Sequence, residues 1–357
     1  MRNIKWILII ILFFPISIYA LEYPSLNSKI VEIYDLTNQE IVYEKDSSNV
    51  VSIASLTKIA TTITAIETIP NLEEEVTITR DILNSVRWDL AKAGLKAGDR
   101  VTYRDLLYAS MVPSGADATH AIAISSSGSI DAYVSKMNEL CLRIGLTNTH
   151  FVNVTGLDAE GHYSTADDVR KLLEYSLKNE LFREIYTTKD YTLSNGLEVH
   201  STILRYNTSS SNINHILGSK TGYTGDAGYC LSTLSDINSH EFIVIVLNAE
   251  VINGLYYHVI DTVTLVDFLL EHFSTQVLVP KDTLVQKIPV RFSKIDEYQL
   301  YSSKDVTKYL PDDYDKEKIK ISYEGLDHLS FLTKEGDSIG KVSYLYDNEL
   351  LFQEEYV

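Results

Sequence analysis

The sequence has 357 residues, of which 45% are hydrophobic and 22% charged, and its formal net charge is −18. These proportions are typical of a folded protein of about two domains, and they exclude collagen-like, low-complexity and disordered chains. The acidic excess argues against a nucleic-acid binder, because that affinity comes largely from neutralising phosphates with Lys and Arg. Two cysteines, Cys141 and Cys230, support neither a disulfide framework nor a thiolate zinc site, and we expect them not to pair.

Residues 1–20 have the pattern of a secretory signal peptide. Arg2 and Lys5 precede an apolar run over 6–18, and small residues precede a cleavage point after Ala20. A run of about thirteen residues is short for a hydrocarbon core of roughly 30 Å. A retained N-terminal anchor, and with it membrane association, is the alternative. In both cases the sequence predicts an exported protein that works outside the cytoplasm.

Periodic patterns then predict mixed strands and helices up to residue 275. A strand, a turn and a strand are expected over 28–44, followed by a helix with apolar residues recurring from Leu56 to Ile66. The later elements are helices over 102–108, 118–124, 130–144 and 165–178, strands over 229–233 and 242–248, and a helix over 259–273. Since 242–248 is apolar throughout, we expect it near the centre of a sheet.

The composition changes after residue 275, and 276–357 has the pattern of a small all-β domain. Short alternating segments predict strands over 287–290, 319–323, 341–346 and 350–357, with a hairpin turn at Gly336. The sequence therefore predicts a signal peptide over 1–20, an α/β domain over 21–275 and a β-rich domain over 276–357.

The segment Ser55-Leu56-Thr57-Lys58 places a hydroxyl and an amine three residues apart at the start of a predicted helix. Positions i and i+3 share a helical face, so the amine can reach the hydroxyl. A serine hydroxyl needs a nearby base, and a lysine can be that base only if its pKa is lowered by burial or a neighbouring cation. A second Ser-x-x-Lys match over 338–341 is interpreted as chance, because that segment alternates like a strand.

Two further segments carry groups suited to chemistry. Lys220 and Thr221 precede a predicted strand, where they could bind a carboxylate, and the Lys220 cation could lower the pKa of Lys58. Gly222 would leave room for a substrate backbone beside the strand. Ser114 lies in a turn between two predicted helices and could relay a proton. Taken singly, each segment is as easily a surface loop.

The order Ser-x-x-Lys, Ser-Gly-x and Lys-Thr-Gly is that of class A β-lactamases and penicillin-binding proteins. Over most of its length the sequence resembles the low-molecular-mass penicillin-binding proteins that are serine D-alanyl-D-alanine carboxypeptidases. The further matching segments are 105–108, 151–158, 162–166, 220–231 and the strands around Gly336. The resemblance implies a β-lactamase/transpeptidase-like α/β domain, an antiparallel sheet with surrounding helices, followed by a small all-β domain.

The resemblance also implies catalytic roles. Ser55 would attack the carbonyl of a D-Ala-D-Ala bond and carry the acyl-enzyme, Lys58 would take its proton, and Ser114 would help pass a proton to the leaving amine. No cofactor and no metal are expected. The implied partners are peptidoglycan stem peptides ending in D-Ala-D-Ala, and β-lactam antibiotics that acylate the same serine.

Substrate binding is implied for the third motif. Lys220, Thr221 and Gly222 would hold the terminal carboxylate and the adjoining backbone. The backbone N–H groups of Ser55 and Tyr223 would form the oxyanion hole, which stabilises the tetrahedral intermediate. The implied setting is the cell wall.

Two positions depart from the family pattern. Ala116 stands where the middle motif usually has Asn, and a missing amide costs on the order of 1–3 kcal/mol if its partner stays unpaired. Water or Asp117 could compensate. His258 stands near the place of a common basic residue, which puts a carboxylate contact there in doubt. Membrane-bound relatives often end in an amphipathic helix, and this sequence does not.

Other enzyme classes fit less well. A zinc peptidase would need a His-x-x-x-His pair, which is absent, so His162 and His200 are expected to be structural or rim residues. A Ser-His-Asp hydrolase would favour Gly-x-Ser-x-Gly, which is also absent. A β-lactamase would need a carboxylate aimed at the deacylating water, and no recognisable loop supplies one. A non-catalytic or weakly active homologue that binds cell-wall peptide, and a D,D-endopeptidase, remain open.

Overall fold

The computed structural model describes residues 22–207, 213–330 and 332–357. The predicted signal peptide and its cleavage point lie outside these residues. Among the residues described, no helix combines the length and the apolar character needed to cross a membrane. The chain forms two compact units, one spanning Pro24–Glu271 and the other taking in His272–Val357.

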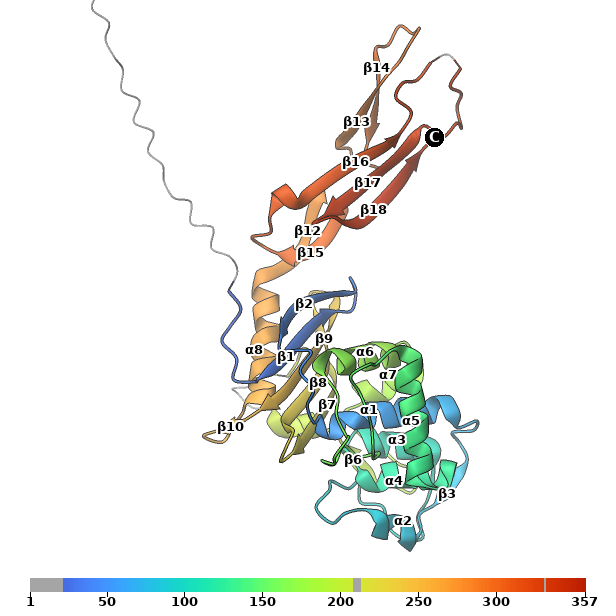
Figure 1. Ribbon diagram of the computed structural model, residues 1–357, viewed down its shortest axis with the longest axis vertical. Coiled ribbons are helices and arrows are strands. Elements are labelled where there is room, and N and C mark those ends of the chain that lie inside the picture. The colour runs from blue at the N-terminus through green and yellow to red at the C-terminus, as the bar shows by residue number, and fades with distance from the viewer. Residues whose placement is uncertain (1–21, 208–212, 331) are drawn as a thin grey trace, which may run out of the picture. The chain divides into compact units, whose positions relative to one another are not determined.

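The first unit is built on a five-stranded antiparallel sheet with the order β2-β1-β9-β8-β7 (Figure 1). Its strands are β1 (Ile30–Asp35), β2 (Glu40–Lys45), β7 (Ile216–Thr224), β8 (Gly228–Ile237) and β9 (His240–Ala249). The central place of β9 confirms the prediction made from its apolar run. The edge strand β7 is not predicted by any pattern, because its Gly, Ser, Lys and Thr residues do not alternate with apolar ones.

Helices cover the sheet. They are α1 (Lys58–Thr68), α2 (Arg80–Ser85), α3 (Tyr103–Met111), α4 (Ala116–Ser127), α5 (Ile130–Ile144), α6 (Ala166–Leu177), α7 (Glu180–Thr187) and α8 (Tyr257–His272), with short 3-10 turns η1 (Ala54–Thr57) and η2 (Thr202–Tyr206). The side chains of Thr102 and Asp105 accept hydrogen bonds from each other's backbone N–H groups and so form a capping box at the start of α3. The short helices α2 and α7 escape prediction because they span too few residues to show a period.

Small two-stranded antiparallel sheets lie between these elements. They pair β3 (Glu75–Thr77) with β4 (Arg100–Thr102), β5 (Asp190–Thr192) with β6 (Glu198–His200), and β10 (Val251–Ile252) with β11 (Leu255–Tyr256).

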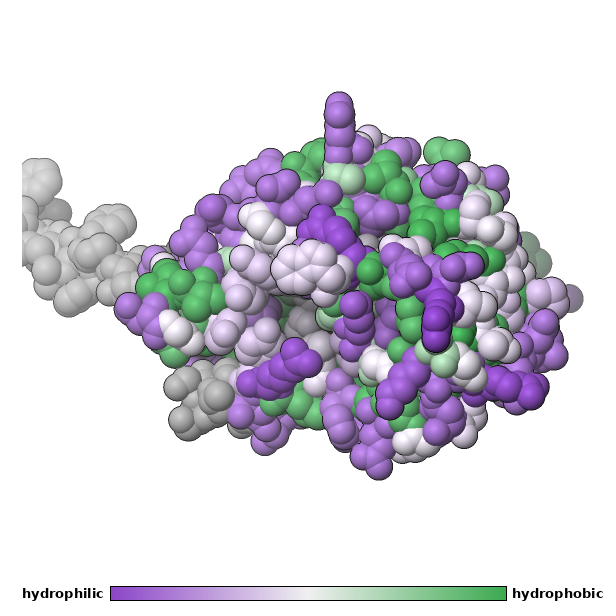
Figure 2. Space-filling model, turned by 90° about the horizontal axis from the view of Figure 1, so that it is seen from below, coloured by the Kyte–Doolittle hydropathy of each residue, from purple (hydrophilic) through white to green (hydrophobic). Residues whose placement is uncertain are grey.

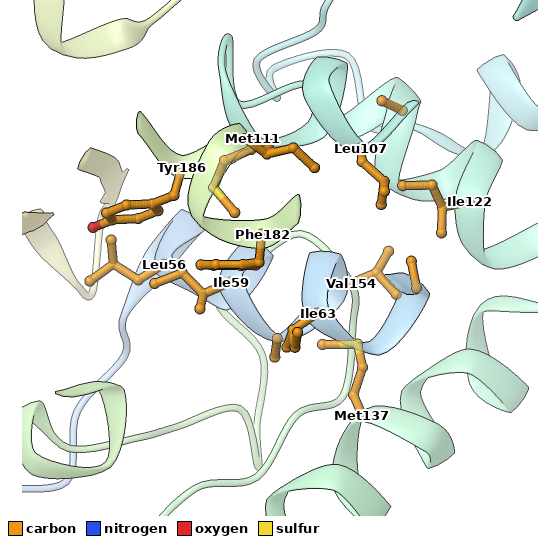
Figure 3. Packing of buried hydrophobic residues seen from close by; sticks show 14 of the residues in the cluster. Leu56, Ile59, Ile63, Leu107, Met111, Ile122, Met137, Val154, Phe182 and Tyr186 are labelled. Atoms are coloured by element: carbon orange, nitrogen blue, oxygen red, sulfur yellow. The ribbon is translucent and has the colours of Figure 1, made fainter. Parts of the chain in front are cut away.

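The main core surrounds η1 and α1. Leu56, Ile59 and Ile63 are buried and face apolar side chains that come from other helices, among them Phe182 of α7 and Met137 of α5 (Figure 3). Burying one such side chain contributes about 1.5–3 kcal/mol. Packing on this face therefore holds the turn that carries Ser55 in place. On the other face of the sheet, α8 packs its own apolar cluster against β7 and β8.

The second unit is all-β apart from one 3-10 turn, η3 (Lys316–Lys318). Its strands are β12 (Phe273–Val279), β13 (Leu284–Pro289), β14 (Glu297–Tyr301), β15 (Val306–Pro311), β16 (Ile319–Gly325), β17 (Gly340–Tyr346) and β18 (Glu349–Tyr356). They form the pairs β12-β15 and β13-β14 and the sheet β16-β17-β18. The four strands predicted for this region are confirmed. Lys341 lies in β17, which agrees with a chance Ser-x-x-Lys match there.

Candidate active site

Ser55 lies in η1, and Lys58 is the first residue of α1. Lys58 Nζ donates a hydrogen bond to Ser55 Oγ at 2.8 Å and another to the carbonyl oxygen of Thr155 at 2.8 Å. The helical turn therefore brings amine and hydroxyl together, as the i, i+3 spacing requires.

The environment of Lys58 favours its neutral form. The side chain is buried, and burial lowers its pKa to about 7, while the charge of Asp117 opposes this shift. Both hydrogen-bond acceptors of the amine, the Ser55 hydroxyl and the Thr155 carbonyl, are uncharged. At neutral pH a large fraction of Lys58 can accept a proton from Ser55.

Lys220 and Thr221 lie side by side on the edge strand β7. Lys220 is buried, and its Nζ donates to the Thr221 carbonyl oxygen at 2.8 Å. Burial, and then the Lys58 charge, hold the pKa of Lys220 well below its usual value. Burial is the larger cause for both lysines, and the repulsion between their charged forms is mutual, so the expected effect of Lys220 on the pKa of Lys58 stays a prediction.

Gly222 is required for a close approach between β7 and η1. A Cβ atom at this position would lie 2.9 Å from the Ser55 nitrogen and 3.0 Å from the Ala54 Cβ. Gly156 faces the same turn, and its Cβ would lie 1.8 Å from the Ala54 carbonyl oxygen. The turn that carries Ser55 occupies the place of a side chain at Gly222, while Gly222 also lines the cleft, and the expected room for a substrate backbone there stays a prediction.

Asn153 organises the loop that supplies the Thr155 carbonyl. Its Oδ1 accepts hydrogen bonds from the backbone N–H groups of Thr155, Gly156 and Leu157 at 3.1, 2.8 and 3.2 Å. Its Nδ2 donates to the Leu157 carbonyl at 2.8 Å. The sequence singled out this segment only as a matching stretch, and its role depends on contacts with η1 and α1 that no local pattern reveals.

The cleft beside Ser55 has a volume of about 240 Å³. Of the residues singled out by the sequence, those lining it are Ser55, Lys58, Ser114, Thr221, Gly222 and Tyr223. Lys220 is not among the lining residues. Ser114 has a positive φ of 65°, a strained conformation for a residue with a side chain. Figure 2 shows a hollow near the centre of the face seen from below, with hydrophilic and hydrophobic residues around it.

The short turn η2 adds three lining residues that the sequence analysis missed, Thr202, Arg205 and Tyr206. The Thr202 hydroxyl is hydrogen-bonded to the Thr221 hydroxyl at 2.6 Å. Arg205 is exposed and brings a guanidinium to the cleft, whereas the amines of Lys58 and Lys220 are buried and have lowered pKa values. No motif marks η2, because only the fold brings it against β7.

Asp117 does not take the place of the missing amide. Its carboxylate accepts hydrogen bonds from the backbone N–H groups of Ala93, Gly94 and Leu95 at 2.8, 3.0 and 3.1 Å. It therefore holds the loop before α3. Ala116 is buried at the start of α4 and does not line the cleft.

His258 carries no positive charge to the cleft. It is buried among Tyr206, Tyr229 and Tyr256, with ring centroids 4.9, 5.0 and 6.1 Å away. Burial lowers its pKa to about 4, so the ring is neutral at pH 7. The basic residue common near this place in the family therefore has no counterpart at position 258.

The remaining sequence candidates have structural surroundings. His162 is buried and hydrogen-bonded to Thr57 at 2.9 Å, whereas His200 is exposed and pairs with Asp190 at 2.6 Å. Cys141 and Cys230 are both free and buried. Within the described part of the chain, no three His, Cys, Asp or Glu side chains gather as a metal ion would require.

Comparison with known proteins places these features in a family. A family model described as D-alanyl-D-alanine carboxypeptidase matches residues 19–251, and one described as the C-terminal domain of penicillin-binding protein 5 matches 273–357. The chain is 27% identical over 316 residues to D-alanyl-D-alanine carboxypeptidase DacF of Bacillus subtilis, covering 87% of this chain and 80% of the relative. It is 32% identical over 251 residues to DacC of Escherichia coli, covering 67% and 62%.

Two further matches bear on fold and activity. The crystal structure of penicillin-binding protein 5 from Haemophilus influenzae superposes with a TM-score of 0.67 and 24% identity, over 94% of this chain and 97% of that one. This likeness confirms the expected fold class. A relative from Pseudomonas aeruginosa named D-alanyl-D-alanine endopeptidase is 28% identical over 241 residues, covering 65% of this chain and 74% of the relative.

Proposed function

Because the chain belongs to the D-alanyl-D-alanine carboxypeptidase family, we propose that it removes the terminal D-Ala from peptidoglycan stem pentapeptides through an acyl-enzyme on Ser55. One observation carries this proposal: Lys58 Nζ lies 2.8 Å from Ser55 Oγ, and burial lowers the pKa of this lysine to about 7. A serine with a neutral amine at hydrogen-bonding distance has the base that an activated nucleophile needs.

Acylation follows from this pair. Lys58 takes the proton of Ser55 as Oγ attacks the carbonyl carbon of the D-Ala-D-Ala bond. The carbonyl oxygen becomes an oxyanion, which the backbone N–H groups of Ser55 and Tyr223 stabilise. The C–N bond then breaks, and a proton reaches the leaving D-Ala amine by way of Ser114. Ser114 lines the same cleft as Ser55 and Lys58, which supports that role.

Strand β7 offers the substrate a place to bind. It is the last strand of the sheet, so its outer edge has backbone groups that no other strand of the sheet pairs. An extended peptide can add to such an edge through main-chain hydrogen bonds. The terminal carboxylate of the substrate would then meet the Thr221 hydroxyl and the Arg205 guanidinium, with Lys220 supporting Thr221 from within.

Deacylation completes the cycle when water attacks the ester carbonyl and releases Ser55. A β-lactam would acylate the same serine, and its ring-opened product would leave slowly. We place this reaction at the cell wall, after export directed by residues 1–20, with 21–275 as the catalytic domain. For 276–357 we propose that the β-rich domain holds the site away from the membrane or binds a partner.

The test is the intact mass of residues 21–357 after exposure to benzylpenicillin, with Ser55→Ala alongside. We expect one penicillin adduct on the wild type and none on the variant, followed by D-Ala release from a pentapeptide. A folded wild type without an adduct would instead favour the homologue that only binds cell-wall peptide, and Ala116→Asn would be the next variant.

A D,D-endopeptidase is the second candidate, because a relative bears that name. It would use the same residues and differ only in the group that leaves. Incubation with a cross-linked peptide dimer and with a free pentapeptide, in parallel, separates the two activities by which substrate is consumed faster.

A further inference from the structure

We infer that His162 is a positioning residue for this reaction: through Thr57 it fixes the peptide plane between Ala54 and Ser55, and so aims the Ser55 N–H at the oxyanion. The inference rests on the proposed function, in which that N–H stabilises the tetrahedral intermediate. It assigns a task to a buried histidine that the proton transfers do not use.

The peptide before Ser55 has an unusual geometry. Ala54 has a positive φ of 47°, in the left-handed region that residues with a Cβ seldom adopt. Its carbonyl and the Ser55 N–H belong to one planar trans peptide, so they point in opposite directions. Any group that holds the Ala54 carbonyl oxygen therefore sets the direction of the Ser55 N–H.

The side chain of Thr57 bonds this carbonyl. Its Oγ1 donates a hydrogen bond to the Ala54 oxygen at 2.9 Å, and its side chain is fully buried. A threonine hydroxyl has one hydrogen to donate, so its second contact must be one in which it accepts. That second contact is His162 Nε2, at 2.9 Å.

The tautomer of His162 follows from two separate contacts. The Val152 N–H donates to Nδ1 at 3.2 Å, which leaves no hydrogen on that nitrogen. The proton must then be on Nε2, where it is donated to Thr57. The ring is buried and burial lowers its pKa to about 4, so this neutral form is the one present at pH 7.

The same ring joins η1 to the loop that serves Lys58. Val152 lies in the segment held by Asn153, whose neighbour Thr155 offers its carbonyl to Lys58. The imidazole thus connects the oxyanion donor and the acceptor of the base. A histidine that only filled the core would need neither the fixed tautomer nor the contact with Thr57.

The experiment measures the rate constant of acylation by benzylpenicillin from pH 5 to 9 in Thr57→Val, Thr57→Ser, His162→Leu and His162→Gln. We expect Thr57→Val and His162→Leu to lower the plateau acylation rate about tenfold to a hundredfold, because a displaced Ser55 N–H would stabilise the oxyanion less well. In Thr57→Val the pH midpoint should stay unchanged, because the surroundings of Lys58 are kept. Thr57→Ser and His162→Gln retain a donor and should stay within about threefold of the wild type.

A double variant tests the route. If His162 acts through Thr57, then Thr57→Val combined with His162→Leu is no slower than Thr57→Val alone. His150→Leu is the matched control, since this imidazole lies in the same loop but bonds the Gly161 carbonyl. It should acylate like the wild type.

Three outcomes overturn the inference. The first is a plateau acylation rate in Thr57→Val that equals that of the wild type. This outcome overturns the inference even if His162→Leu does not fold. Another is an equal loss in His162→Leu and His162→Gln that follows their melting temperatures, which would mark a purely structural role. The third is a wild type that is not acylated, or a Ser55→Ala variant that is; this would remove the proposed function itself.

Discussion

Lys58 shows how burial decides the chemistry of one residue. The sequence places it three residues from Ser55, and only the folded core removes it from water and lowers its pKa to about 7. Asp117, whose charge raises this pKa, is itself held by the backbone of 93–95. The amine therefore titrates in the range where a general base is most effective.

The first prediction concerns pH. Since Lys58 must be neutral to accept the proton, we expect the acylation rate to rise with pH up to about 7 and then to level off. Below that point it should fall by about tenfold per pH unit. Benzylpenicillin acylation measured from pH 5 to 9 checks this. Lys58→Arg, which stays charged, should be inactive throughout; a flat wild-type profile would contradict the assignment.

The second prediction concerns Gly222. Its replacement by Ala puts a methyl group 2.9 Å from the Ser55 nitrogen, so β7 or η1 must shift. We expect acylation to fall by about a hundredfold, since a misplacement near 1 Å can cost that much. Gly225→Ala in the next turn meets nothing within 4 Å and serves as the matched control. Equal rates for the two variants would show that the close approach is unimportant.

At the scale of elements, the site depends on how a loop meets a hairpin. Asp158, in the loop that follows Asn153, accepts hydrogen bonds from the Thr224 hydroxyl at 2.7 Å and from the Asp226 N–H at 3.1 Å. These bonds attach the turn between β7 and β8 to the loop that bonds Lys58. The backbone N–H of Tyr223, which we propose as an oxyanion donor, lies just before that turn, so its position depends on the attachment.

The third prediction tests this attachment. Asp158→Ala should lower the free energy of unfolding by about 1–2 kcal/mol and slow acylation by about tenfold, because two bonds to a charged acceptor are lost. Glu160→Ala, an exposed carboxylate two residues away, controls for the change in charge. The measurements are urea unfolding and the acylation rate of both variants. An unchanged acylation rate in Asp158→Ala would mean that β7 needs no such support.

For the whole molecule, acid sensitivity follows from buried neutral histidines. Burial lowers the pKa of His120, His162 and His258 to about 4, compared with 6.5 for an exposed imidazole. Between these values the unfolded chain binds protons that the folded chain does not. The contribution of these three histidines to the free energy of unfolding therefore falls as the pH drops from 6.5 towards 4.

The fourth prediction isolates one of these groups. His258→Phe removes a fully buried imidazole whose two nitrogens have no hydrogen-bond partner among the residues that the structure describes, and replaces it with an apolar ring. Between pH 7 and 5 this variant should lose about 2 kcal/mol less stability than the wild type. Urea unfolding at both pH values measures the difference, with His200→Phe at the surface as control. The same loss in His258→Phe and in the wild type would refute the assignment.

The sequence by itself determined what depends on local order along the chain. The helical period of α1 brings Ser55 and Lys58 together, the apolar run of β9 indicates a central strand, and the motif order indicates the family. Of the strands that the structure describes in the second unit, β13, β16, β17 and β18 follow from simple alternation, whereas β12, β14 and β15 were not predicted. Each of these features is encoded within a few neighbouring residues, so no knowledge of distant contacts is needed.

Only the tertiary structure decided what depends on residues far apart. It made β7 an edge strand, brought Arg205 and the Thr155 carbonyl to the cleft, and buried His258 away from any charged role. It also placed the Asp117 carboxylate where it accepts a hydrogen bond from the backbone N–H of Ala93. The physical reason is that desolvation, close backbone approach and hydrogen-bond partners are properties of packed surfaces. They exist only once segments distant in sequence are in contact.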